Sequence, residues 1–216
     1  MADYDITTDD GVVNFAQIFI ERRLKGFKKD IAICLRPDEN NSHAYMPGLM
    51  ACFSLLDFFS SLYAGQMRGH SHEQLIKYMR AFAPPDRYDD YLLKVAYIAF
   101  RHKLAHLSHP YFVLNTQKDC RINERQMLLT WTISEEAHDP PIKLCPLKRP
   151  KKITRHPTPW PLFYDHRIYI SIRTLADDIM DTAPKYLAEL KESKELKKNF
   201  RTCMCEFYQT KISTSA

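Results

Sequence analysis

The sequence predicts a mainly α-helical bundle with a small β-containing, Pro-rich insertion before its C-terminal helix. Up to Pro110, apolar residues recur at steps of three and four, which is the spacing of one helix face, whereas β-branched and aromatic runs follow it. Seven of the 13 prolines lie between Pro140 and Pro161, where they exclude a helix interior. We therefore expect a helical bundle at 1–110, an insertion at 111–172, and C-terminal helices packing on the bundle at 173–216.

The expected helices follow from apolar periodicity and from the residues that begin or end a helix. Ser71 with Gln74 three residues later forms a capping box, and Thr174 followed by Asp177 resembles one. Pro184 should kink or divide the helix in which it lies. The expected helices span residues 12–35, 44–66, 71–83, 87–108, 174–192 and 194–207.

Three short segments have the composition of strands, namely Tyr111–Asn115, Gln126–Ser134 and Arg167–Ile172. The Pro-rich segment between the second and third of them is expected to be a loop. All strands should therefore lie within about 110–172.

Composition excludes several classes of protein. With 45% hydrophobic and 12% aromatic residues among 216, the chain can bury a core. Its N-terminus is acidic and lacks the features of a signal peptide, and no uninterrupted apolar run is long enough to span a membrane. We expect a cytoplasmic protein with no membrane partner, with reduced cysteines, and with no cofactor and no resident metal, since a Gly-rich phosphate loop and paired zinc-ligand motifs are lacking.

The helix expected at 87–108 is apolar on both sides and therefore central, yet it ends in the charged sequence FRHKLAHLSHP. The helix at 44–66 is apolar except for a narrow stripe of Ser54, Asp57 and Ser61. We interpret this stripe as a close helix–helix contact or a hydrated edge. The alternative is that Asp57 pairs with a cation such as Arg101, because buried charges are seldom left alone.

Positive charge is concentrated in one segment of thirteen residues that contains no acid. This run is either a solvated loop or, because Trp160 and Phe163 follow it, a groove for single-stranded RNA. Its cations are Lys143, Lys148, Arg149, Lys151, Lys152 and Arg155.

The apolar helix, the short amphipathic helix and the helix through FRHKLAH together resemble the HEPN superfamily, whose shared mark is Arg-x(4–6)-His with a polar residue after the arginine. Arg101 and His106 match this mark, and the resemblance as a whole covers residues 12–110. His102 fills the polar position, where asparagine or aspartate is commoner. The resemblance implies a dimeric, metal-independent ribonuclease in stress or phage defence, which can have an antitoxin partner. It further implies that His106 is the general acid or base at the ribose 2′-hydroxyl and that Arg101 is the phosphate clamp. We expect Asp57 and His109 to support this site.

An ideal helix would aim Arg101 and His106 about 140° apart, so a composite site in a homodimer is expected. A catalytically inactive protein-interaction module is the main alternative. In that case Arg101 would be a core arginine neutralised by Asp57, and His102 and His109 would be hydrogen-bonded core histidines. A third possibility is a metal site, because His102, His106 and His109 are spaced i, i+4 and i+7.

Overall fold

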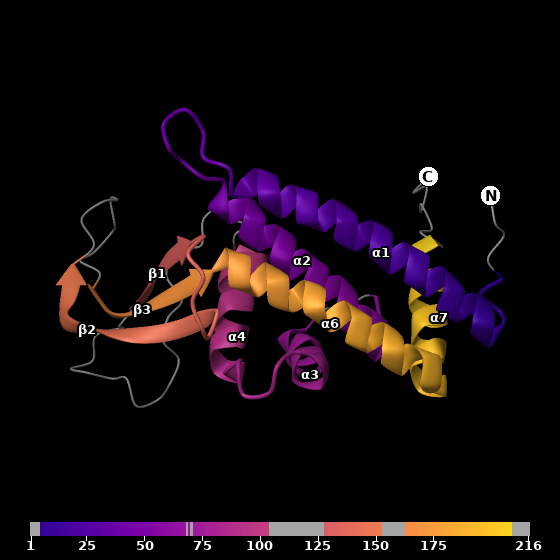
Figure 1. Ribbon diagram of the computed structural model, residues 1–216. Helices are drawn as coiled ribbons and strands as arrows, with labels where there is room; N and C mark the ends of the chain where they lie inside the picture. The colour runs from indigo at the N-terminus through magenta and orange to yellow at the C-terminus, as the bar shows by residue number, and fades with distance from the viewer. Residues whose placement is uncertain (1–4, 68, 70, 104–127, 153–162, 209–216) are drawn as a thin grey trace, which may run out of the picture.

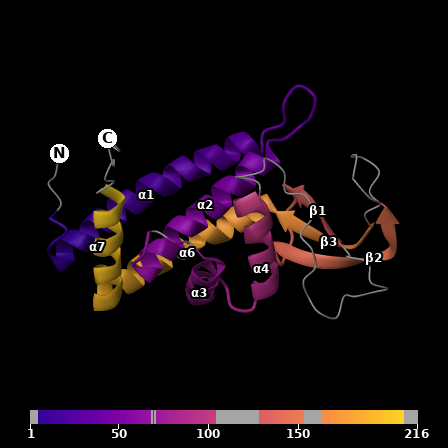
Figure 2. The same ribbon diagram turned by 180° about the vertical axis from the view of Figure 1, so that it is seen from behind.

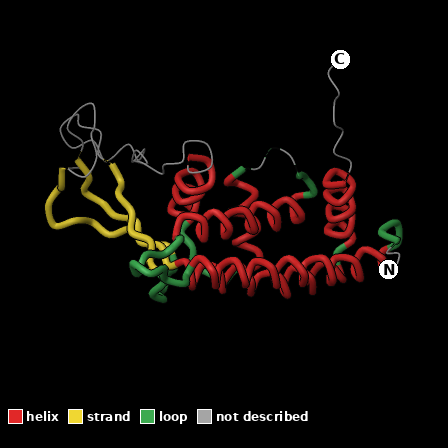
Figure 3. Tube along the Cα trace, turned by 90° about the horizontal axis from the view of Figure 1, so that it is seen from above, coloured by secondary structure: helices red, strands yellow, loops and turns green. Residues whose placement is uncertain are grey.

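Three long helices lie side by side along the molecule in the computed structural model, which describes residues 5–67, 69, 71–103, 128–152 and 163–208 (Figures 1 and 2). Shorter helices cover their flank and one end, and a three-stranded sheet lies at the opposite end (Figure 3). The long helices are α1 (Asp9–Cys34), α2 (Tyr45–Ala64) and α6 (Ile172–Glu192); the shorter ones are α3 (His72–Phe82), α4 (Asp90–Tyr97) and α7 (Lys194–Tyr208). A π-helical turn, η1 (Ile98–Lys103), continues α4, and the strands are β1 (Leu128–Ser134), β2 (Ile142–Lys152) and β3 (Phe163–Ser171).

The predicted class, a mainly helical protein with a small strand-containing region before its C-terminal helices, is confirmed. Apolar periodicity located the helices to within a few residues, with the exception of the one expected at 87–108. The capping box at Ser71 is present, with both reciprocal bonds to Gln74. Helix α1 begins earlier than expected, because the Thr8 hydroxyl accepts the backbone N–H of Gly11.

Helix α2 forms the centre of the core. By length and composition it is the one helix among the described residues that could cross a membrane, but 67% of that apolar window is buried inside the protein. Around its second half lies a cluster of large rings, in which Phe59 stacks on Tyr78 at 5.7 Å between centroids. The Tyr78 hydroxyl donates to Thr182 of α6 at 2.8 Å, so the buried phenol has a partner.

The helix expected at 87–108 begins later than predicted and is irregular. Asp89 caps it through the N–H of Leu92, and Asp86 has a positive φ of 60°, so the preceding residues form a turn instead of a helical start. After Tyr97 the helix widens into η1, and residues 104–108 lie outside the described part of the chain.

The C-terminal helices correct two other expectations. Ser171, not Thr174, caps α6, because its hydroxyl accepts the N–H of Thr174. Pro184 does not divide α6, which continues from Ile172 to Glu192. The proline is exposed, so water can satisfy the carbonyl that loses its hydrogen bond.

The strands form one sheet with the order β1-β3-β2, in which β1 runs parallel and β2 antiparallel to β3. The prediction of a loop in the Pro-rich segment was wrong for Ile142–Lys152, which form β2. Proline is tolerated there because β2 is an edge strand, where the lost N–H donor need not face a neighbouring strand. The strand expected at Tyr111–Asn115 lies outside the described residues.

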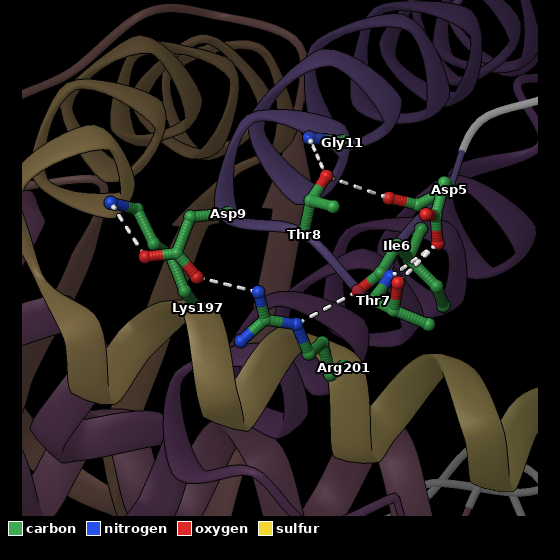
Figure 4. Close-up of polar contacts among 8 residues, drawn as sticks. All are labelled: Asp5, Ile6, Thr7, Thr8, Asp9, Gly11, Lys197 and Arg201. Atoms are coloured by element: carbon green, nitrogen blue, oxygen red, sulfur yellow. Dashed lines mark hydrogen bonds and ion pairs between the residues drawn. The ribbon is translucent and has the colours of Figure 1, made fainter.

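The start of α1 is fastened to α7 at the end of the bundle away from the sheet (Figure 4). Arg201 Nε donates to the carbonyl of Ile6 at 2.8 Å, and its Nη2 donates to Asp9 at 2.5 Å. Lys197 lies 3.6 Å from the same carboxylate. The hydrogen bond from Arg201 lowers the pKa of Asp9, which shows that the folded structure favours the charged acid.

Gly65 ends α2, and we expect it to tolerate no side chain. It has a φ of 72°, and an added Cβ would lie 2.6 Å from Oδ1 of Asn199, whose amide donates to the carbonyl of Tyr63 at 2.8 Å. Gly65→Ala should lower the free energy of unfolding by about 2 kcal/mol, as backbone strain and a disturbed hydrogen bond add.

Gly69→Ala provides the matched control in urea unfolding followed by circular dichroism. Gly69 has a similar φ of 75°, but its nearest non-neighbouring atom would be 3.5 Å from the added Cβ. It should lose only about 1 kcal/mol. Equal losses at both positions would mean that the contact with Asn199 has no energetic weight.

Candidate functional site

A buried ion pair joins the central helix to the π-helical turn. Arg101 Nε donates to Oδ2 of Asp57 at 2.6 Å, and the side chains are 31% and 7% exposed, respectively. The two residues are 44 positions apart in sequence. The guanidinium therefore has one fixed anchor in the core and lies only partly in solvent.

Other polar groups lie around Asp57. Burial, and then the hydrogen bond to Asp57, raise the pKa of the Tyr97 hydroxyl. The hydroxyls of Ser60 and Ser61 donate to the main-chain carbonyl of Asp57 at 3.0 and 2.7 Å. The polar stripe of α2 is buried at Asp57 and Ser61 but exposed at Ser54. Asp57 pairs with Arg101, which was the alternative interpretation.

Arg101 lies in a π-helical turn, a rare conformation that recurs at functional sites. The backbone of His102 belongs to the same turn, but its side chain is outside the described part of the structure, as are His106, His109 and Arg155. Whether Arg101 and His106 face one phosphate therefore stays a prediction. Among the described residues, no group of three His, Cys, Asp or Glu side chains is arranged to hold a metal ion.

The basic segment forms a bulged edge strand. Pro146 is paired with His166 and Lys151 with Tyr164, so residues 147–150 lie opposite a single residue of β3. Two prolines without an N–H favour this break in the ladder. The bulge and the strand end present exposed cations that have no ion-pair partner among the described residues: Lys148, Arg149, Lys151 and Lys152.

The two faces of the sheet differ in chemistry. Ile168 and Ile170 of β3 are buried against the bundle, and on the same face Trp131 meets Phe100 of η1 at 6.0 Å between rings. The alternate residues of β3, Arg167 and Tyr169, point to the opposite, outer face.

A tyrosine between two cations marks the outer face. The Tyr169 ring lies 5.8 Å from Lys143 Nζ and 5.9 Å from Arg167 Cζ. The sequence interpretation missed Arg167 and Tyr169 as candidates. The alternation in RIYISI was the available signal, because it separates two core isoleucines from an outward arginine and tyrosine.

A second buried carboxylate was also missed. Asp178 of α6 accepts the Tyr88 hydroxyl at 2.6 Å and lies 3.1 Å from Arg87 Nε, which is also 3.2 Å from Asp139 in the β1–β2 connection. Burial raises the pKa of Asp178, against the hydrogen bond from Tyr88. A cavity of about 370 Å³ lies beside Arg87, between α4 and the start of β2. The cluster fastens the sheet to the bundle, and no sequence spacing indicates it.

Comparison of the chain with family models, with curated proteins and with solved structures gives no match. Functional inference therefore depends on the chemistry of the sites above.

Breaking the Asp57–Arg101 pair should be costly. Arg101→Met leaves a carboxylate in the core without its partner, and we expect the free energy of unfolding to fall by about 2–4 kcal/mol. Asp57→Leu combined with Arg101→Met should recover most of this loss, because no buried charge remains. Urea unfolding of the four proteins in the double-mutant cycle measures the coupling.

The exposed pair Arg80–Asp90 is the matched control, with side chains 70% and 39% exposed. Arg80→Met should cost less than about 1 kcal/mol. Additive losses at Asp57 and Arg101 would contradict a direct ion pair between them.

Proposed function

We propose that this protein binds single-stranded RNA along the outer face of its sheet and the bulge of β2. The observation that carries the proposal is the continuity of the two features: Tyr169 between Lys143 and Arg167 leads along β3 toward the bulge that presents Lys148 and Arg149. An aromatic ring that stacks on a base, beside cations that contact phosphates, is the usual combination in proteins that bind single strands.

The distribution of charge supports RNA binding at the sheet and not over the whole protein surface. Asp57, Asp9 and Asp178 each have cationic partners within the bundle, whereas the exposed cations of β2 have no such partner among the described residues. Although Asp165 of β3 lies opposite the bulge, cations that form no ion pair keep more of their attraction for a polyanion.

Another explanation of the same residues is protection of a sheet edge. Lysine and proline on an edge strand prevent pairing with other strands, and this requires no ligand. Edge protection does not require Tyr169 on the outer face, however, and it predicts no affinity for RNA.

Salt dependence tests the phosphate contacts. Affinity for a single-stranded RNA oligonucleotide should fall steeply with salt, because bound cations release counterions. Changing Lys148, Arg149, Lys151 and Lys152 to glutamine should make the slope of log K against log salt shallower by up to about 3, at roughly 0.7 per phosphate contact. Fluorescence anisotropy over a salt series measures the slope.

Helix α1 offers a control of identical composition, because Arg22, Lys25, Lys28 and Lys29 are also exposed. Their replacement by glutamine should leave the slope nearly unchanged. Tyr169→Ala should weaken binding about 5- to 150-fold at every salt concentration without changing the slope, since stacking contributes about 1–3 kcal/mol per base. An unchanged slope in the β2 variant would mean that these cations protect the sheet edge and do not contact phosphates.

We propose ribonuclease activity as a second function. It is favoured by the anchoring of Arg101, because a guanidinium fixed by a buried carboxylate at Nε and still partly exposed suits a phosphate clamp. The resemblance to the HEPN superfamily implies that His106 transfers the proton in this reaction. A homodimer would bring two copies of FRHKLAH together.

The catalytic proposal is tested with RNA in EDTA. His106→Ala should reduce the cleavage rate by about 10²–10⁴-fold, because a general acid or base contributes that much, while RNA affinity stays near that of the wild type. His109→Ala should have a smaller effect. If the wild type cleaves no faster than His106→Ala, the protein binds RNA without cleaving it.

A further inference from the structure

Helix α1 carries a second stripe of residues beside its buried one. Phe19, Arg23, Gly26, Asp30 and Ile33 follow one another at alternating steps of four and three. This is the spacing by which one helix packs along another. The core uses a different stripe, which consists of Val12, Ala16, Ile20, Phe27 and Ile31.

Arg23 is a partly buried cation surrounded by aromatic rings. Its guanidinium carbon lies 4.3 Å from the ring of Phe58, 5.0 Å from that of Phe19 and 5.4 Å from that of Phe207. Nε is buried without a hydrogen bond, and the side chain forms no ion pair with any described residue. Burial lowers the pKa of Arg23.

Phe19 packs against rings of the chain, but the part of the stripe after Arg23 lacks partners among the described residues. Asp30 is exposed and forms no ion pair there, and Ile33 is 65% exposed. Gly26 lies in mid-helix, although a Cβ at this position would meet no atom within 4 Å. Glycine is unfavourable in a helix, and no contact among the residues that the structure describes requires it here. A glycine in such a position lets another backbone approach closely.

The stripe is complementary to itself when reversed. Counting outward from Gly26, Phe19 and Ile33 each lie seven residues away, whereas Arg23 lies three residues before it and Asp30 four residues after it. The two opposite charges therefore come within one residue of each other when the stripe is reversed. We propose that a second copy of the chain packs antiparallel against this stripe, α1 on α1, about a two-fold axis near Gly26. Arg23 then faces the partner's Asp30, Phe19 faces the partner's Ile33, and the two glycines meet at the axis.

A second copy suits the stripe better than a nucleic acid does, because Asp30 would repel phosphates. The end of α7 adds apolar surface beside Phe19, since Phe207 is 38% and Tyr208 is 65% exposed. These rings would cover the partner's Ile33. Both ends of the interface thus bury apolar surface, and the charges between them form two equivalent ion pairs.

This dimer goes beyond the proposed RNA binding and does not depend on it. Helix α1 runs from the end of the bundle at α7 toward the end that carries the sheet (Figure 1). Antiparallel packing therefore places the two sheets, and the two η1 turns, at opposite ends of the dimer. A composite ribonuclease site would need a different interface.

Sedimentation equilibrium of the full chain, freed of nucleic acid, tests the interface. The wild type should form a reversible dimer, and Asp30→Arg should weaken it at least about tenfold by placing two arginines together. Arg23→Asp should do the same. An equimolar mixture of the two variants should form dimers again, because each contact in the mixed dimer pairs Arg with Asp.

Two further variants separate docking from folding. Gly26→Gln should keep or raise the thermal stability of the monomer, since glutamine favours helix, while it weakens the dimer. Lys28→Glu, an exposed charge reversal outside the stripe, should leave dimerisation unchanged. A wild type that stays monomeric, a dimer unaffected by Asp30→Arg, or a dimer lost in His106→Ala would each overturn the proposal.

Discussion

The burial of α2 is the constraint on which the rest of the structure depends. A helix apolar on nearly every side must be covered on every side, and α1, α3, α6, α7 and η1 are placed by that requirement. Its single buried carboxylate, Asp57, requires a cation from one of these covering elements, and Arg101 in η1 supplies it. The same pair that completes the core thus fixes the orientation of the residue that sequence analysis selected for catalysis, so structural and catalytic roles of Arg101 are not exclusive.

The sheet obeys a different constraint, because within the described part of the chain the bundle packs against one of its faces. Isoleucines of β1, β2 and β3 pack on the end of the bundle, and the alternation of side chains then presents Tyr169 and its two cations on the other face. The break in the ladder at the two prolines of β2 frees Lys148 and Arg149 from the regular pleat. Rigid scaffolding and exposed charge therefore coincide in this segment, which is what recognition of a flexible polyanion requires.

Most of the helical fold followed from the sequence, since apolar periodicity and caps are local properties. The candidate sites followed only in part. Lys148 and Arg149 were identified from charge alone, but as members of a loop, because a segment so rich in proline has no strand signature. Arg167 and Tyr169 were missed, since a strand pattern does not say which face will be covered. Arg101 was selected from its motif, and its pairing with Asp57 could be offered only as an alternative, because a partner 44 residues away leaves no periodic pattern in the sequence.

The sequence by itself determined that this chain forms long helices around one very apolar helix, with strands confined to the region before the C-terminal helices, because hydrophobic spacing and proline act over a few residues. Only the tertiary structure decided which charges are neutralised. Asp57 and Asp178 are buried beside arginines, whereas Arg23 is enclosed by rings from three helices and has no acid among the described residues as a partner. Desolvation is the physical reason. The energy of a charge depends on everything that surrounds it in space, and neighbours in space are not neighbours in sequence.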